Sequence, residues 1–153
     1  MSSTLAALVA QSERQRDLAV ADRQKAQQDS DAAAAKAEEL HLYRREYEAR
    51  WSAQFCREGQ IELVRCYHGF MARLTQALEH QQRVAAAAAS QLASAIGTVR
   101  ECELQVAAVQ KLRERRLSEQ RGEARRHEQK LDDELAARIA WQARRAAGSK
   151  DAA

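Results

Sequence analysis

The sequence predicts an all-α fold: a long antiparallel two-helix coiled coil, or α-hairpin, with a projecting C-terminal helical arm. Three observations favour this fold. The 153-residue chain contains no proline. Alanine, glutamate, glutamine, arginine and leucine dominate it, which is typical of coiled coils. Small and apolar residues also recur at alternating steps of three and four, the spacing of a helix that packs along another helix.

The longest apolar stripe lies in the middle of the chain, and Gln81 is its single polar member. Its members are Val64, Tyr67, Met71, Leu74, Leu78, Gln81, Ala85, Ala88, Leu92, Ala95, Val99, Cys102, Val106 and Val109. A stripe of this length needs a partner helix, because an isolated helix would leave it exposed to water.

The first predicted helix runs from about residue 4 to about residue 56. Its first half is weakly apolar, because polar side chains interrupt the heptad at Gln15, Asp22 and Asp29. The apolar positions assigned to this helix are Leu5, Leu8, Leu18, Leu40, Tyr43, Tyr47, Trp51 and Phe55.

A turn is predicted at about residues 57–60, because Gly59 can adopt the left-handed conformation that ends a helix. The second helix then runs from about residue 61 to about residue 147, and residues 1–153 form a single coiled-coil domain. Gly69 and Gly97 lie within the stripe and are interpreted as glycines that the helix tolerates, with close packing as the alternative.

Antiparallel pairing about this turn brings together residues whose numbers add to roughly 116 to 118. Residues 32–35 would then face residues 85–89, so two alanine stretches would meet. The first helix is also the shorter one, which leaves the second helix as an unpaired arm from about residue 113.

The formal net charge is only +3, but the excess positive charge lies near the C-terminus. Residues 111–147 contain eleven lysines and arginines against seven aspartates and glutamates. Acidic residues interleave with the arginines, whereas a DNA-binding helix presents a continuous basic face to the phosphates. This pattern favours a protein partner, and no nucleic-acid partner is expected.

No enzymatic activity, metal or cofactor is expected from the sequence. It contains no glycine-rich phosphate loop, no nucleophile elbow and no HExxH zinc motif. Glu123 and His127 stand four residues apart and could share a metal, but a solvated helix face is the favoured interpretation. Cys56, Cys66 and Cys102 are interpreted as small buried hydrophobic residues rather than reactive thiols.

The sequence also favours a cytoplasmic location. No stretch approaches the roughly 20 apolar residues of a membrane span. The N-terminus lacks the basic patch and apolar region of a secretory signal. Three cysteines without metal-like spacing indicate a reducing compartment.

Aromatic residues gather near the predicted turn. Every tyrosine and phenylalanine, and one of the two tryptophans, falls between residues 43 and 70. Two interpretations remain open, because the group can be the core at the end of the hairpin or an exposed patch that binds a protein.

Three groups of residues occur in order along the chain: residues 40–47, residues 67–74 together with Ala77, and residues 112–115 with 128–134. In this order they resemble the motifs of the flagellar export protein FliJ family. The family's first-helix tyrosine motif is similar to residues 40–47, and its second-helix motif is similar to residues 67–74 together with Ala77. Its C-terminal signature is similar to residues 112–115 and 128–134. The resemblance covers most of the chain and is weakest over the first 35 residues.

The resemblance implies a stalk or coupling component of the flagellar type III export apparatus, and with it roles in flagellum biogenesis, motility and chemotaxis. Its expected partners are the hexameric export ATPase, the cytoplasmic domain of the export gate protein FlhA, and export chaperones. The expected location is the cytoplasmic face of the inner membrane, with peripheral association only through protein partners.

The resemblance also implies binding residues. Those expected to bind the export gate are Leu40, Tyr43, Tyr47, Phe70, Leu74 and Ala77. Those expected to bind the ATPase ring are Arg113, Arg116, Glu128, Gln129, Lys130, Asp133 and Glu134. Lys36 and Gln81 stand at two further positions of the gate-binding surface and depart from the family's pattern.

Two alternatives stay open at this point. The stalk protein of a virulence type III secretion system would share the fold and the role, and genomic neighbours would separate the two. A structural coiled coil with one long helix per chain in a parallel dimer would also fit the stripe. The molecular mass and a cysteine crosslink between positions near 33 and 85 would distinguish this dimer from a hairpin.

Overall fold

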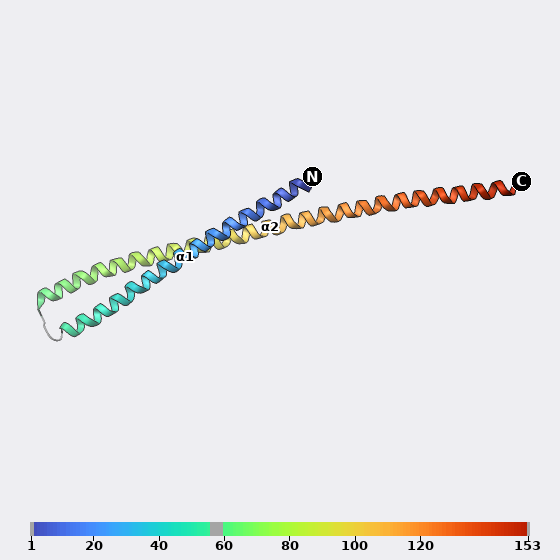
Figure 1. Cartoon of the computed structure of the whole chain (residues 1–153). Coiled ribbons are helices and arrows are strands. Elements are labelled where there is room, and N and C mark those ends of the chain that lie inside the picture. Colours follow the sequence, from blue (N-terminus) through green and yellow to red (C-terminus); the bar gives the residue numbers. More distant parts are fainter. Residues whose placement is uncertain (1, 56–59, 153) are drawn as a thin grey trace. The chain divides into compact units, whose positions relative to one another are not determined.

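The computed structural model describes residues 2–55 and 60–152, and these residues form two long helices (Figure 1). Helix α1 spans Ser2–Phe55 and helix α2 spans Ile61–Asp151. The carbonyl oxygen of Gln60 accepts a hydrogen bond of 3.3 Å from the backbone N–H of Val64, so Gln60 is the N-cap residue that precedes α2. Residues 57–59 of the predicted turn, and Cys56, lie outside the described residues.

The two helices pack against each other as an antiparallel hairpin, which confirms the predicted fold class. The ring of Tyr47 on α1 lies against the ring of Phe70 on α2, with 4.4 Å between their centroids. The side-chain amide of Gln81 donates a hydrogen bond of 3.3 Å to the carbonyl oxygen of Ala33. The residue numbers of both pairs add to within a few units of the predicted value. These contacts contradict the alternative of one long helix per chain.

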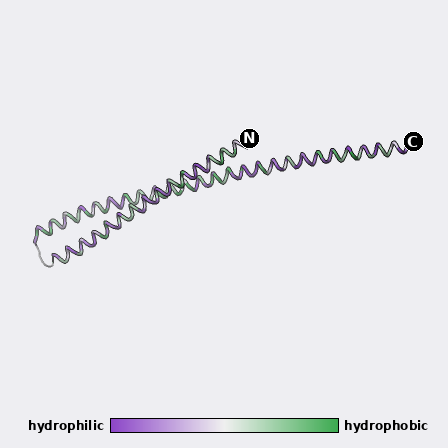
Figure 2. The backbone as a smooth tube through the Cα atoms, in the orientation of Figure 1, coloured by the Kyte–Doolittle hydropathy of each residue, from purple (hydrophilic) through white to green (hydrophobic). Residues whose placement is uncertain are grey.

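The predicted stripe of α2 is the seam of this interface, because all fourteen of its members are buried or half-buried. The most enclosed are Val99, Leu78 and Val106, whose exposed fractions are 3%, 4% and 5%. Hydrophobic and hydrophilic residues alternate along both helices, as a two-helix interface requires (Figure 2). Among the described residues no side chain is less than 2% exposed, since one partner helix cannot enclose a residue fully.

The seam of α1 differs from the predicted one in its first half. Leu8 and Leu18 are 47% and 68% exposed, although both were assigned to the apolar face. The positions that α1 turns towards α2 are occupied mostly by small residues. The buried ones are Leu5, Val9, Ser12, Ala19 and Ala33. The prediction was wrong here because it followed side-chain size, whereas the four-three spacing selects small residues at these positions.

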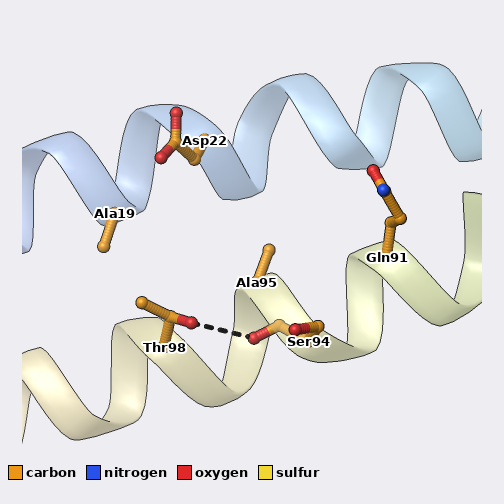
Figure 3. A pocket seen from close by; sticks show the side chains of 6 residues that line it. All are labelled: Ala19, Asp22, Gln91, Ser94, Ala95 and Thr98. Atoms are coloured by element: carbon orange, nitrogen blue, oxygen red, sulfur yellow. Dashed lines mark hydrogen bonds between the residues drawn. The ribbon is translucent and has the colours of Figure 1, made fainter.

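Small residues leave a shallow hollow beside the middle of the seam (Figure 3). Ala19 of α1 and Ala95 of α2 both point into the space between the helices, and Asp22 also lines the hollow. The Thr98 hydroxyl bonds to the carbonyl oxygen of Ser94 at 3.1 Å and so turns to its own helix rather than to α1. The side chains between the helices are therefore smaller here than around Leu74 and Leu78.

The structure confirms that the two central glycines are tolerated by the helix and excludes the alternative of close packing. Gly69 and Gly97 are both exposed, and a Cβ atom built on either would meet nothing within 4 Å. The helix tolerates glycine at both positions, and no neighbouring residue requires the absence of a side chain there.

The chain divides into two compact units. One comprises residues 10–106, and the other comprises residues 1–9 together with 107–153. Within the second unit, every described α2 residue from Gln110 onward is exposed, except for Gly122. No helix of the described part of the chain is long and apolar enough to span a membrane.

Candidate functional site

A row of four aromatic residues follows the C-terminal half of α1. Tyr43, Tyr47, Trp51 and Phe55 are spaced four residues apart, and successive ring centroids are 5.7, 6.0 and 5.4 Å apart. Each step of four residues advances about 40° around an α-helix, so the row winds about 120° around the axis. The row therefore cannot lie wholly within the seam.

Helix α2 adds two rings that cross the interface. Phe70 contacts Tyr47, while Tyr67 lies 5.5 Å from Trp51 and 5.2 Å from Phe55 in an edge-to-face arrangement. Aromatic pairs of this kind contribute about 0.5–1.5 kcal/mol beyond their buried area. Together with His68, which lies 5.5 Å from Tyr67, these residues form one continuous group that we call the aromatic cluster.

The aromatic cluster is partly core and partly surface, so both interpretations left open by the sequence apply to different members. Tyr47, Trp51, Phe55, Tyr67 and Phe70 are half-buried. Tyr43 and His68 are exposed, with Tyr43 at 46%. The Tyr43 ring is therefore exposed to solvent, and the Tyr47 ring contacts it on one side.

One ion pair lies beside the cluster. Arg44 Nε is 3.5 Å from a carboxylate oxygen of Glu48, one helical turn further along α1. Both side chains are partly exposed, at 35% and 47%. The pair contributes only a few tenths of a kcal/mol to stability, but it keeps the Arg44 side chain directed along its own helix.

The structure brings some of the residues expected to bind the gate together and separates others. Tyr43, Tyr47 and Phe70 form a chain of ring contacts across the two helices. Leu74 is only 8% exposed and belongs to the seam, so it lies beneath the exposed aromatic residues rather than among them. Leu40 is half-buried in the seam of α1, and Ala77 is exposed on α2.

The residues expected to bind the ATPase ring are all exposed on α2. They do not share one face, because their spacing distributes them around the helix. Two pairs do stand four residues apart on a common side: Gln129 with Asp133, and Lys130 with Glu134. This part of α2 thus presents charges of both signs in several directions.

Sequence reasoning missed a set of exposed apolar residues in the same part of α2. Leu131, Leu135 and Ile139 are spaced four residues apart and are 52%, 57% and 59% exposed. Trp141 is 61% exposed, and the Arg145 guanidinium lies 5.0 Å from the centre of its ring. The four-residue spacing was the signal that could have found this row.

The structure describes two of the three cysteines. Cys66 is exposed, so the prediction that it is buried was wrong, while Cys102 is half-buried in the seam. Over residues 2–55 and 60–152, no group of three or more histidine, cysteine, aspartate or glutamate side chains could hold a metal ion.

Comparison with known proteins identifies the family of the chain. A family model described as flagellar FliJ protein matches residues 1–145, which is nearly the whole sequence. No curated protein and no solved structure gave a match. The matched region contains both halves of the aromatic cluster and most of the exposed C-terminal part of α2. The chain therefore belongs to the FliJ family of flagellar proteins.

Proposed function

We propose that this protein is a stalk that couples the export ATPase to the export gate. Membership of the FliJ family implies a non-catalytic, structural component of the flagellar export apparatus. The observation that carries the finer proposal is the aromatic cluster, in which Tyr47 and Phe70 join the two helices and Tyr43 remains exposed.

The aromatic cluster would bind the cytoplasmic domain of the gate protein FlhA. Exposed aromatic groups beside a packed interface are typical anchors of protein–protein contacts, because a large ring adds contact area at little cost in side-chain entropy. The Tyr43 ring already contacts Tyr47 in the free protein, so binding would restrict the Tyr43 side chain little further.

The C-terminal part of α2 would bind the hexameric ATPase ring. It combines charges of both signs with the exposed row Leu131, Leu135 and Ile139. An exposed apolar row bordered by mixed charges suits a protein partner, in which the row supplies affinity and the charges fix orientation and register.

The proposed mechanism is mechanical and non-covalent. Nucleotide hydrolysis would occur in the ATPase, and the helices would transmit the resulting movement to the gate. Association with the cytoplasmic face of the inner membrane would follow from these protein contacts, and export chaperones would be further partners. The stalk of a virulence secretion system remains the second candidate, because it requires the same two surfaces.

The test is a pair of full-length variants with opposite expected losses. The first is Tyr47→Ala with Phe70→Ala, which removes one of the ring contacts between the helices. We expect it to weaken binding to the gate's cytoplasmic domain by at least about 30-fold, which is the effect of losing a hot spot of about 2 kcal/mol. Binding to the ATPase should be unchanged.

The second variant exchanges Lys130→Glu with Glu134→Lys, which leaves the net charge unaltered. It should weaken binding to the ATPase and leave gate binding intact. Helix content measured by circular dichroism should match the parent in both variants. Tyr43→Ala tests the gate-binding surface separately. Because Tyr43 is 46% exposed, its truncation should disturb the hairpin less than the double variant does. If both variants bind both partners as the parent does, the proposal is wrong.

A further inference from the structure

The charge of α2 changes abruptly after Glu134. Residues 111–134 contain eight lysines and arginines against seven aspartates and glutamates, so this stretch is almost neutral overall. Residues 135–150 contain four basic residues and no acidic one. Every residue of the second stretch is exposed on the helix. The end of α2 is therefore a basic segment that differs in kind from the mixed-charge segment before it.

Residues 135–147, which we call the terminal segment, divide into two faces around the helix axis. Successive residues of an α-helix are rotated by about 100°. With this rotation, seven of the thirteen residues occupy one arc of about 140°, and all seven are apolar. We call them the apolar arc: Leu135, Ala136, Ile139, Ala140, Ala143, Ala146 and Ala147.

The opposite face of the terminal segment carries all of its charge. Arg138, Arg144 and Arg145 lie outside the apolar arc. Arg138 flanks one edge of the arc and Arg144 flanks the other. Arg145 is directed to Trp141, with 5.0 Å between its guanidinium and the centre of the ring. The terminal segment is therefore an amphipathic helix with basic side chains beside both edges of its apolar face.

The apolar arc is shallow, because its alanines are small and only two of its side chains are large. Leu135 and Ile139 are 57% and 59% exposed, so the free chain leaves the arc uncovered. A helix with such an arc can lie close to a broad apolar layer, while long arginine side chains at its edges extend to a polar layer above. This geometry is typical of helices that lie in the surface of a bilayer.

The single sign of the charge favours a lipid surface over a protein surface. A protein surface carries charges of both signs, and residues 111–134 carry both signs as well. A bilayer that contains anionic lipids presents negative charge alone, and basic residues near it are attracted without any opposing repulsion. The terminal segment has the charge that matches the bilayer, because it lacks acidic residues altogether.

We propose that the terminal segment binds the surface of an anionic phospholipid bilayer. The helix lies parallel to the surface, with the apolar arc at the boundary of headgroups and acyl chains and Arg138 and Arg144 at the phosphates. This is a direct lipid contact, in addition to any attachment through protein partners. Leu135 and Ile139 also belong to the row proposed to bind the ATPase ring. If that proposed function holds, the chain binds lipid and ring in turn rather than together.

The first test measures binding of the full chain to vesicles by co-sedimentation. One set of vesicles contains phosphatidylethanolamine and phosphatidylglycerol in equal parts, and the other contains phosphatidylcholine alone. We expect binding to the anionic vesicles only. Raising the salt from about 50 mM to about 500 mM should release the chain, because salt screens the attraction between exposed charges.

Hydrogen exchange with mass spectrometry locates the contact. Anionic vesicles should slow amide exchange over residues 135–147, because the helix is ordered on the surface. Exchange over residues 111–130 should change much less, since these residues carry almost balanced charge. A soluble acidic polymer, poly-glutamate, supplies negative charge without an apolar layer and should not slow exchange in the terminal segment.

The charge requirement is tested with two double variants that make the same change at neighbouring arginines of α2. Arg144→Glu with Arg145→Glu should weaken binding to anionic vesicles by at least about tenfold. Arg125→Glu with Arg126→Glu is the matched control, because both arginines are exposed but lie among acidic residues. This control should weaken binding by less than about threefold.

The apolar requirement is tested with Ile139→Ser in the apolar arc. This variant should weaken vesicle binding by at least about threefold, because it removes one of the two large side chains that enter the bilayer. Leu117→Ser is the matched control, since Leu117 is 42% exposed and lies outside the terminal segment. It should change vesicle binding by less than about twofold.

Three results would overturn the inference. The first is a chain that does not bind anionic vesicles at low salt, or that binds phosphatidylcholine vesicles equally. The second is equal loss of binding in the two arginine double variants. The third is slowed exchange in the terminal segment with poly-glutamate, which would indicate an acidic protein partner instead. None of these experiments contains the ATPase or the gate, so the proposed function and this inference can fail independently.

Discussion

The side-chain amide of Gln81 on α2 donates a hydrogen bond of 3.3 Å to the carbonyl oxygen of Ala33 on α1. Forty-eight residues separate the two along the chain, so the contact exists only because the chain folds back on itself. Gln81 is the polar member of an otherwise small and apolar seam, and its bond reaches one particular carbonyl. A polar seam residue of this kind fixes the register of two helices at some cost in stability.

Gln81→Leu should therefore raise the free energy of unfolding by about 1 kcal/mol, because it replaces a half-buried amide with an apolar side chain of similar size. Urea unfolding followed by circular dichroism measures the change. Gln82→Leu is the matched control, since Gln82 is exposed and should shift stability by less than about 0.5 kcal/mol. A loss of stability in Gln81→Leu would show that the hydrogen bond outweighs apolar burial.

Leu78→Ala and Leu18→Ala test the position of the seam with one chemical change. Leu78 is 4% exposed, so its truncation should cost about 2–3 kcal/mol. Leu18 is 68% exposed, and its truncation should cost less than about 0.5 kcal/mol. Equal costs in thermal or urea unfolding would place Leu18 in the interface and contradict the seam.

Gly97→Ala should stabilise the hairpin by about 0.5–1 kcal/mol, because glycine in a helix interior carries a conformational entropy cost and no neighbour occupies the space of the added methyl group. The same change at Gly69 should have a similar effect, since a Cβ there also meets nothing within 4 Å. Destabilisation at either position, measured by chemical unfolding, would mean that another helix or a second chain approaches it closely.

The part of α2 after about residue 113 should exchange its amide hydrogens much faster than the seam does. Its described residues are exposed apart from Gly122, and a helix without packing is marginal in water. Hydrogen exchange with mass spectrometry measures this directly, and the seam around Leu78 and Val99 supplies the protected reference within the same molecule. Uniform protection along α2 would show that this segment is packed in the free protein.

The sequence predicted the α2 half of the interface residue by residue. Large apolar side chains at strict spacing leave only one way to turn that helix towards a partner, and every member from Val64 to Val109 is buried or half-buried. The cross-helix meeting of Tyr47 and Phe70 is also compatible with the predicted antiparallel register.

The α1 half was harder to predict because small residues carry little pattern. Ala19 and Ala33 are buried although alanine is common on every face of this helix, and Leu18 is exposed although it is large. Heptad spacing, and not side-chain size, marks which small residues face inward. The exposure of Cys66 and of the row from Leu131 to Ile139 was missed for a related reason, since residue type was weighed there without heptad phase.

The most direct test of the fold-back is a crosslink between α1 and α2. The full chain carries Ala33→Cys and Gln81→Cys, the positions joined by the hydrogen bond, with the three native cysteines changed to serine. After treatment with a short bismaleimide, denaturing gels and mass spectrometry should show one chain with an internal bridge, at concentrations where the protein is a monomer. Bridges that join two chains, with no internal bridge at any concentration, would contradict the hairpin and with it the proposed stalk.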